Sequence, residues 1–290
     1  MAPSSPAAST IRTNTLGFRR DLRPPRTALP AGACDAHMHI VGPQASYPFT
    51  ATRSLSPPEA TWRDYRGTMR VLGLSRCVIV QPSFYGADNR CTLDAVAESE
   101  GCARAVVVVA ADVTRDEIAR MHAQGARGVR LQMVAKGGVD LGAMEPIAAQ
   151  IAPFGWHLQL YLDAEELPAL AARLRGLPVP LVFDHMAHVV RDHGLDGPGF
   201  RLLLDLLGEG RAWVKLSNAL FTPSAERARR LVAASPERVL WGTDWPHVAL
   251  GEDGVPDDAA LVDDLAAWIP DPAVRRQALV SNPDALYFRA

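Results

Sequence analysis

The stretch CVIVQPS, residues 77–83, joins a run of apolar residues to a polar end that carries Gln81 and Ser83. The run does not alternate between apolar and polar positions, as a strand with one face in water would. Near-continuous apolar runs are typical of strands buried on both faces, which occur in parallel sheets covered by helices. The stretch therefore predicts a parallel sheet whose strands end in polar side chains.

Seven further runs of this kind occur along the chain: CDAHMHI (34–40), AVVVVA (105–110), GVRLQM (128–133), HLQLYL (157–162), LVFDH (181–185), AWVKLS (212–217) and VLWGTD (239–244). Between them apolar residues recur every three or four positions, which predicts helices over 92–100, 114–125, 164–176, 199–210 and 224–236. Eight strand and helix units in succession favour an α/β fold of the distorted (β/α)8 TIM-barrel type over an open doubly wound sheet. No glycine-rich nucleotide-binding motif follows any of these strands.

The pattern also predicts how the chain is divided. Residues 1–30, rich in Pro, Ser and Ala at their start, are expected to form a flexible tail, and residues 31–290 a single barrel domain. Residues 42–62 are longer than an ordinary loop after a barrel strand. Because such loops lie on the catalytic face of a barrel, this segment is a candidate lid.

The composition excludes several classes of partner. The 30 basic and 32 acidic residues give a net charge of −2 and form no long run of one sign, which argues against a nucleic-acid or membrane surface. No segment approaches the roughly 20 apolar residues of a membrane span. Four cysteines without a CxxC pair indicate free thiols in a reducing compartment, so we expect a cytoplasmic protein with a small-molecule partner. The oligomeric state stays open.

Polar residues cluster where the predicted strands end. His37 and His39 are two residues apart on one strand and therefore share a face, and the same alternation predicts that Asp35 points with them, deeper in the barrel. His185 and Asp244 end the sixth and eighth runs. The carboxyl ends of barrel strands meet at one face, so the three histidines and Asp244 are expected to converge there. Imidazoles beside a carboxylate are a common ligand set for a divalent metal.

Six motifs, in order, resemble the amidohydrolase superfamily of distorted TIM barrels, and within it the branch of 2-pyrone-4,6-dicarboxylate lactonases and sugar-lactone isomerases. These motifs are GACDAHMHIVGP, VIVQPSFYGADN, GVRLQM, GWHLQLYLDAE, PLVFDHMAHV and RVLWGTDWPH, and they cover nearly everything beyond the tail. The resemblance implies that His37, His39, His185 and Asp244 are the catalytic residues, with Asp244 taking a proton from the attacking water.

The same four residues hold one or two divalent metals in most of the superfamily, whereas the lactonase and lactone-isomerase branch is thought to work without one. No lysine stands at a fourth-strand position that would suggest a carbamylated bridging ligand. We therefore expect no cofactor. If a metal binds, it is expected to be a single zinc or manganese ion on His37, His39, His185 and Asp244.

The resemblance further implies a carboxylate-bearing lactone as substrate, and eight residues are expected to bind it: Ser83, Tyr85, Asn89, Arg130, Lys136, Tyr161, His188 and His247. Arg130 stands where the branch has a carboxylate-binding arginine, whereas Lys136 and His188 replace arginines. Lys and His do not reproduce the bidentate fork of Arg. A sugar-acid lactone is therefore expected before the pyrone dicarboxylate.

The main expectation is thus a hydrolase that opens a carboxylated lactone with water activated by Asp244. A lactone isomerase or a decarboxylase acting at the same site is the alternative. A non-catalytic binding protein built on an inherited barrel is a remote third, disfavoured because all four site residues are intact.

Overall fold

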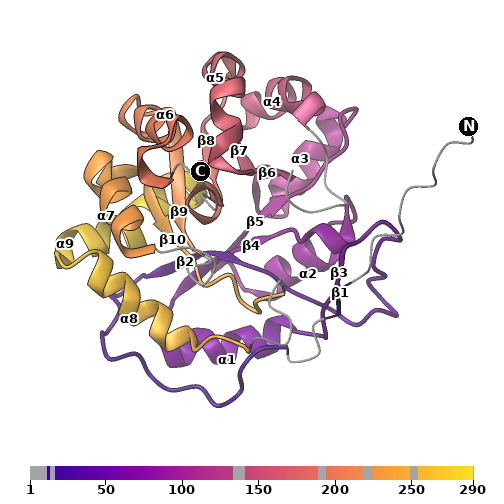
Figure 1. The fold of residues 1–290 in the computed structure, drawn as a ribbon. Coiled ribbons are helices and arrows are strands. Elements are labelled where there is room, and N and C mark those ends of the chain that lie inside the picture. The colour runs from indigo at the N-terminus through magenta and orange to yellow at the C-terminus, as the bar shows by residue number, and fades with distance from the viewer. Residues whose placement is uncertain are drawn as a thin grey trace, which may run out of the picture.

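A computed structural model describes residues 12–13, 17–132, 141–188, 194–217, 224–248 and 254–289. In this part of the chain, eight parallel strands form one sheet that curls into a barrel with helices on the outside (Figure 1). The order in the sheet is β10 (Val239–Trp241), β9 (Ala212–Leu216), β8 (Leu181–Phe183), β7 (His157–Tyr161), β6 (Ala126–Gln132), β5 (Ala103–Val107), β4 (Arg76–Val80) and β2 (Cys34–Met38). The predicted (β/α)8 barrel and its eight strands are confirmed.

The five predicted helices correspond to α2 (Arg90–Glu98), α3 (Arg115–Ala123), α5 (Leu167–Gly176), α6 (Pro198–Gly208) and α7 (Ser224–Ala234). The structure adds α1 (Trp62–Leu72), α4 (Met144–Ile151), α8 (Asp258–Trp268) and α9 (Pro272–Arg276). Capping boxes begin α1 and α3, in which Thr61 pairs with Asp64 and Thr114 with Glu117. Short helical segments include η1 (Ser83–Tyr85), η3 (Ala152–Phe154), η5 (His185–His188) and the π-helical η10 (Asp284–Phe288).

The barrel interior is apolar near the strand starts. Side chains from β2, β4, β5, β8, β9 and β10 form one buried cluster there: Cys34, Ala36, Val78, Val80, Val106, Val182, Trp213 and Leu240. Tyr287 of η10 packs into the same cluster, so the C-terminal segment closes this end. A larger cluster lies between the strands and the surrounding helices and contains Met38, as expected for a residue that faces the helices. The polar side chains of the predicted site therefore lie at the opposite end of the barrel, where the strands end.

The barrel closes at that opposite end through residues of the predicted site. β2 and β10 are the two edges of the sheet. Beyond β10 the N–H of Asp244 donates to the carbonyl oxygen of His37 at 2.8 Å, and the N–H of His39 donates to the carbonyl oxygen of Trp245 at 2.7 Å. We call these two hydrogen bonds the seam. Gly242 permits the close approach, because a Cβ at this position would lie 2.6 Å from Cβ of His37.

The prediction for Asp35 is wrong. Its carboxylate points out of the barrel and accepts hydrogen bonds from the hydroxyls of Tyr65 on α1, at 2.7 Å, and Thr243, at 2.6 Å. The register of β2 against β4 shifts between Asp35 and Met38. Such an irregularity breaks the two-residue alternation of a strand, so His37 faces inward although Asp35 faces outward.

The N-terminal segment contacts the barrel over the residues that the structure describes there. β1 (Arg12–Thr13) pairs with β3 (Leu55–Ser56) of the 42–62 loop. Phe18 packs its ring 4.8 Å from that of Trp245, and Arg23 pairs with Asp257 of α8 at 2.7 Å. Of the tail predicted for residues 1–30, residues 17–30 thus border the barrel, while 1–11 and 14–16 lie outside the described residues.

The 42–62 loop, predicted as a lid, packs on η1. Phe49 places its ring 4.9 Å from the ring of Phe84, and the N–H of Thr50 donates to the carbonyl oxygen of Phe84. At its ends, Val41 bridges Ala60. No helix in the described part of the chain has the length and apolar character needed to cross a membrane.

Candidate active site

One carboxylate oxygen lies at the centre of the predicted site. Oδ1 of Asp244 is 3.3 Å from Nε2 of His39, 3.5 Å from Nε2 of His37 and 4.0 Å from Nε2 of His185. All four side chains are buried and come from the ends of β2, β8 and β10. The structure thus brings together the four residues that the sequence selected as catalytic.

The protonation states of these groups follow from burial and from one another. Burial lowers the pKa of His185 to about 4 and that of His37 well below its ordinary range. Burial alone would raise the pKa of Asp244, but His185, the contact with His39 and the nearby His37 lower it more. At neutral pH the site therefore holds a charged Asp244 beside neutral rings of His37 and His185.

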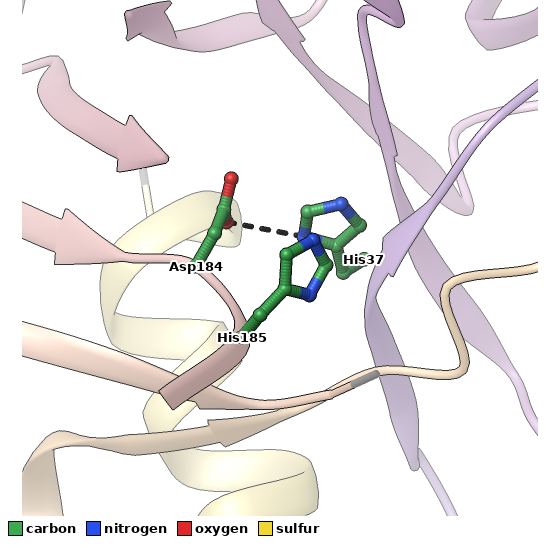
Figure 2. Close-up of side chains that lie close together, drawn as sticks. All are labelled: His37, Asp184 and His185. Atoms are coloured by element: carbon green, nitrogen blue, oxygen red, sulfur yellow. Dashed lines mark ion pairs between the residues drawn. The ribbon is translucent and has the colours of Figure 1, made fainter. Parts of the chain in front are cut away.

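A second buried cluster, built around Asp184, contacts His37 on the Nδ1 side of its ring. Asp184, which follows β8, places Oδ1 3.1 Å from Nδ1 of His37, and Figure 2 shows the two side chains facing each other with His185 beside them. Oδ2 of Asp184 accepts hydrogen bonds from Nε of Arg130 at 2.8 Å and from the amide of Gln159 at 3.1 Å. These contacts hold the carboxylate in one orientation.

Lys215 completes this cluster. Its Nζ donates to Oε1 of Gln159 at 2.7 Å and lies 3.6 Å from Oδ1 of Asp184 and 3.4 Å from Nδ1 of His37. Burial lowers the pKa of Lys215 to about 8, although Asp184 acts in the opposite direction. Two cations, Lys215 and Arg130, thus lie against the single carboxylate of Asp184.

Hydrogen bonding fixes the tautomer of His39. Its Nδ1 lies 2.7 Å from the carbonyl oxygen of Val80, and because a carbonyl only accepts, Nδ1 carries the proton. In the neutral ring Nε2 then presents a lone pair to Oδ1 of Asp244, 3.3 Å away. Two lone pairs that face each other require a proton or a cation between them.

The residues also fit a single divalent ion. The ligand atoms of His37, His39 and Asp244 lie within 4.8 Å of one another, and so do those of His37, Asp184 and His185. Within the described residues, Nε2 of His37 has no hydrogen-bond partner. Two imidazoles and a carboxylate are donors that zinc and manganese accept.

Three of the predicted substrate-binding residues line the same end of the barrel. The guanidinium of Arg130 lies 5.1 Å from the ring centre of Tyr161. The ring of Tyr161 is 5.0 Å from that of His185 and 5.5 Å from that of His188. These residues form a cationic and aromatic wall beside the catalytic cluster.

Three others lie on the loop that follows β4. Gln81 holds this loop, because its amide donates to the carbonyl oxygens of Gly86 and Asp88. Ser83 and Tyr85 are buried in η1, and the Tyr85 hydroxyl accepts from the N–H of Gly42 at 3.0 Å. The side-chain amide of Asn89 makes two hydrogen bonds to the backbone of Val108. Its Nδ2 donates to the carbonyl oxygen at 2.7 Å, and its Oδ1 accepts from the N–H at 2.9 Å.

The last two predicted substrate-binding residues are His247 and Lys136. His247 lies close behind Asp244, and its Nε2 is 2.9 Å from Oδ1 of Asp258 on α8. Lys136 lies outside the described residues. The substrate-binding role of both stays a prediction.

The segments after β8 and β10 have an unusual backbone. His185, Met186, Ala187 and His188 have φ between 46° and 55°, and Asp244 has φ of 65°. This left-handed region is costly for residues other than glycine, and such residues concentrate at functional sites. The conformation aims His185 and Asp244 toward His37 from two separate loops.

A family model described as amidohydrolase matches residues 34–289. The chain belongs to the amidohydrolase family. Among the relatives of this amidohydrolase, the 4-sulfomuconolactone hydrolase of Hydrogenophaga intermedia is 35% identical over 98% of this chain and 97% of that protein. The 2-pyrone-4,6-dicarboxylate hydrolase of Comamonas testosteroni is 37% identical over 91% and 92%. The D-galactarolactone isomerase of Agrobacterium fabrum is 33% identical over 91% and 93%.

The predicted family and branch are therefore confirmed for this amidohydrolase. Sequence reasoning assigned no role to four of its site residues: Gln159, Asp184, Lys215 and Ser217. The sequence contained a signal for them, because each is a polar residue in or just after an apolar run that predicts a buried strand. What it could not supply was the pairing between strands, which turns these residues into a support for His37 and His185.

Proposed function

We propose that this amidohydrolase hydrolyses a lactone that bears at least one carboxylate. The observation that carries the proposal is the placement of one oxygen of Asp244 within 4.0 Å of Nε2 of His37, His39 and His185. Support comes from relatives named as hydrolases of 4-sulfomuconolactone and of 2-pyrone-4,6-dicarboxylate. Arg130 supplies a cation beside the cluster that suits an anionic substrate.

In the proposed reaction Asp244 is the base. Its carboxylate accepts a proton from water while the water oxygen bonds to the carbonyl carbon of the lactone. The negative charge moves to the carbonyl oxygen, where N–H groups of the site stabilise it. When the carbonyl re-forms, the ring C–O bond breaks, and the ring oxygen takes the proton back from Asp244.

His185 is the proposed hydrogen-bond donor to the charged carbonyl oxygen. Its pKa of about 4 keeps the ring neutral at the pH of the reaction. The Ser217 hydroxyl lies 2.8 Å from Nδ1 of His185. When that hydroxyl donates to Nδ1, the remaining proton of the ring sits on Nε2, the nitrogen nearer to Asp244.

Arg130 is the proposed partner of the substrate carboxylate. Its Nε is bonded to Asp184, so the terminal nitrogens are the ones that can pair with a ligand. Tyr161 and His188 complete this wall. Ser83, Tyr85, Asn89, Lys136 and His247 stay predicted contacts.

The reaction is proposed to proceed without a resident metal, as the resemblance to the lactonase and lactone-isomerase branch implies, with Arg130 and Lys215 both paired to Asp184. A divalent ion, when bound, would be held by His37, His39, His185 and Asp244 and would polarise the lactone carbonyl as a Lewis acid. The residues' own tasks are unchanged in either case: Arg130 orients the substrate, and Asp184 and Lys215 orient His37.

The test is an assay of purified protein against a sugar-acid lactone, 2-pyrone-4,6-dicarboxylate and an uncharged lactone of the same ring size. We expect kcat/KM for one carboxylated lactone to exceed that for the uncharged ring by at least about 100-fold, as loss of a charge-assisted contact would produce. Equal rates for charged and uncharged rings would contradict the proposed substrate class.

Isomerisation is the second candidate, favoured by the relative named D-galactarolactone isomerase. In that reaction a substrate hydroxyl, in place of water, would give its proton to Asp244 and bond to the carbonyl carbon. The original ring C–O bond would then break, and the released oxygen would take the proton from Asp244. Product NMR in water enriched in oxygen-18 separates the two reactions. Hydrolysis leaves a ring-opened acid that carries the label, whereas isomerisation leaves an unlabelled ring.

A further inference from the structure

A cavity of about 640 Å³ lies at the end of the barrel opposite the candidate active site. It is bordered by η3, by the starts of β6 and β9, by the turn before β10 and by η10. Because the proposed reaction uses the carboxyl ends of the strands, this cavity is a separate site.

The cavity is lined by an excess of positive charge. Arg127, Arg238 and Arg289 are among its lining residues, and none of the described residues that line it is an aspartate or glutamate. Of the nearby carboxylates, Asp284 pairs with Arg76 at 2.7 Å and with Arg289 at 3.4 Å, and Glu237 accepts from the Ser235 hydroxyl at 2.7 Å. Among the described residues Arg127 and Arg238 form no ion pair, so the lining offers these two cations to a ligand from solution, and Arg289 can add a third by exchanging its contact with Asp284.

Two of the arginines are held in place by the fold. Nη1 of Arg127 donates to the carbonyl oxygens of His122 and Ala126, at 3.0 and 2.7 Å, which anchors the guanidinium where β6 begins. Arg238 stacks 4.8 Å over the ring of Trp213, and its buried Nε has no hydrogen-bond partner among the described residues. A buried donor of this kind is costly unless a ligand or water satisfies it.

His122 adds an oriented donor. The indole N–H of Trp156 donates to Nδ1 of His122 at 2.9 Å, so the neutral ring carries its own proton on Nε2. Burial and the nearby Arg127 both lower the pKa of His122. Phe154 and Trp213 supply apolar surface between the polar groups. The cavity thus combines fixed donors with a flat apolar wall, as small-molecule sites do.

We propose that this cavity binds a small molecule bearing at least two negative charges on carboxylate or phosphate oxygens. Arg127, Arg238 and Arg289 pair with the oxygens, and Trp213 contacts the body of the ligand. Guanidinium groups suit both kinds of oxyanion through bidentate pairing. The inference is independent of the proposed lactone chemistry, because it uses no residue of the candidate active site.

The experiment is isothermal titration of the purified full-length protein with citrate and, separately, with inorganic phosphate. The test variant is Arg238→Gln with Arg289→Gln, since neither side chain bonds to the backbone in the described part of the structure. The control is Arg229→Gln, which removes one positive charge from an exposed position on α7, outside the cavity. Thermal unfolding and lactonase activity are measured alongside, and both should stay at the wild-type level in all variants.

We expect wild type to bind at least one of the two anions and the double variant to bind it at least about tenfold more weakly. Arg229→Gln should bind it as wild type does. Binding of citrate alone assigns the cavity to polycarboxylates, and binding of phosphate alone assigns it to phosphate-bearing ligands. Failure of both anions to bind wild type, or equal binding by wild type and the double variant, overturns the proposal.

Discussion

His37 and Asp244 are joined twice, once through their backbones and once through their side chains. The N–H of Asp244 donates to the carbonyl oxygen of His37 at 2.8 Å, and Oδ1 of Asp244 lies 3.5 Å from Nε2 of His37. The first contact belongs to the seam that closes the barrel, and the second belongs to the candidate active site. Substitutions here can therefore separate activity from folding.

Asp244→Asn should abolish the base without disturbing the seam. The seam uses the backbone of residue 244, and asparagine tolerates its φ of 65° better than most residues. We expect kcat/KM to fall about 100- to 10,000-fold, the usual contribution of a general base. Steady-state kinetics and circular dichroism check this, and a folded variant with wild-type activity would remove Asp244 from the mechanism.

Gly242→Ala should damage both the fold and the activity. The added Cβ would lie 2.6 Å from Cβ and 2.7 Å from the backbone nitrogen of His37, so the strands at the seam must separate. Overpacking of this kind costs roughly 1–3 kcal/mol in unfolding free energy, and more where backbone must move. The control is Gly67→Ala on α1, where a Cβ meets no atom within 4 Å. Urea denaturation of both variants gives the comparison, and equal stability would contradict the tight approach.

Lys215→Met should destabilise the protein because it leaves Asp184 with one cation fewer. Removal of one partner from a buried ion pair costs about 3–5 kcal/mol. Arg173→Met, which breaks the exposed pair with Glu145, should cost less than about 1 kcal/mol. Chemical denaturation near neutral pH measures both, and a loss for Lys215→Met no larger than for Arg173→Met would show that the buried charges are not coupled.

Stability should decline as the pH falls from about 6.5 to 4. The pKa of His185 is about 4 in the folded protein and near 6.5 in the unfolded chain, so the unfolded chain binds the proton first. The contribution of His185 to the free energy of unfolding is fully present above pH 6.5. It falls by about 3 kcal/mol by pH 4. His185→Gln should remove that share of the pH dependence. Denaturation curves at pH 7 and 4.5 for both proteins check it, and parallel pH dependences would contradict the assignment.

Chelation should leave the activity intact. Because the proposed reaction uses Asp244 as the base and needs no Lewis acid, dialysis against a chelator is expected to change kcat/KM by less than about twofold. Elemental analysis of the active protein should find less than one equivalent of zinc or manganese. Loss of activity on chelation, with recovery on adding either metal, would replace the metal-free proposal by one with a resident ion.

The sequence predicted the barrel and the four central residues because both follow from local patterns. Buried strands have a characteristic composition, and the carboxyl ends of parallel strands converge whatever joins them. His37, His39, His185 and Asp244 could therefore be brought together by reasoning from strand ends alone. The prediction for Asp35 failed because the irregularity in β2 depends on its pairing with β4, which no local pattern reveals.

The supporting cluster was out of reach for a similar reason. A buried lysine in the run AWVKLS signals that a partner exists, but the partners of Lys215 are Gln159 and Asp184 on two other strands. Their contacts depend on the registers of β7 against β8 and of β8 against β9. The grouping of arginines in the opposite cavity could not be predicted either. Arg127 and Arg238 are more than a hundred residues apart, and in the sequence each is typical of an isolated surface charge.

The seam also bears on how the protein is made. His37 and His39 leave the ribosome about 200 residues before Asp244 and Trp245, so the first strand must wait with one edge open until the last strand has been synthesised. Until then His37 and His39 have no Asp244 to face. We therefore expect a chain that ends before residue 244 to lack the candidate active site, so that the site and the closed barrel are completed in the same step.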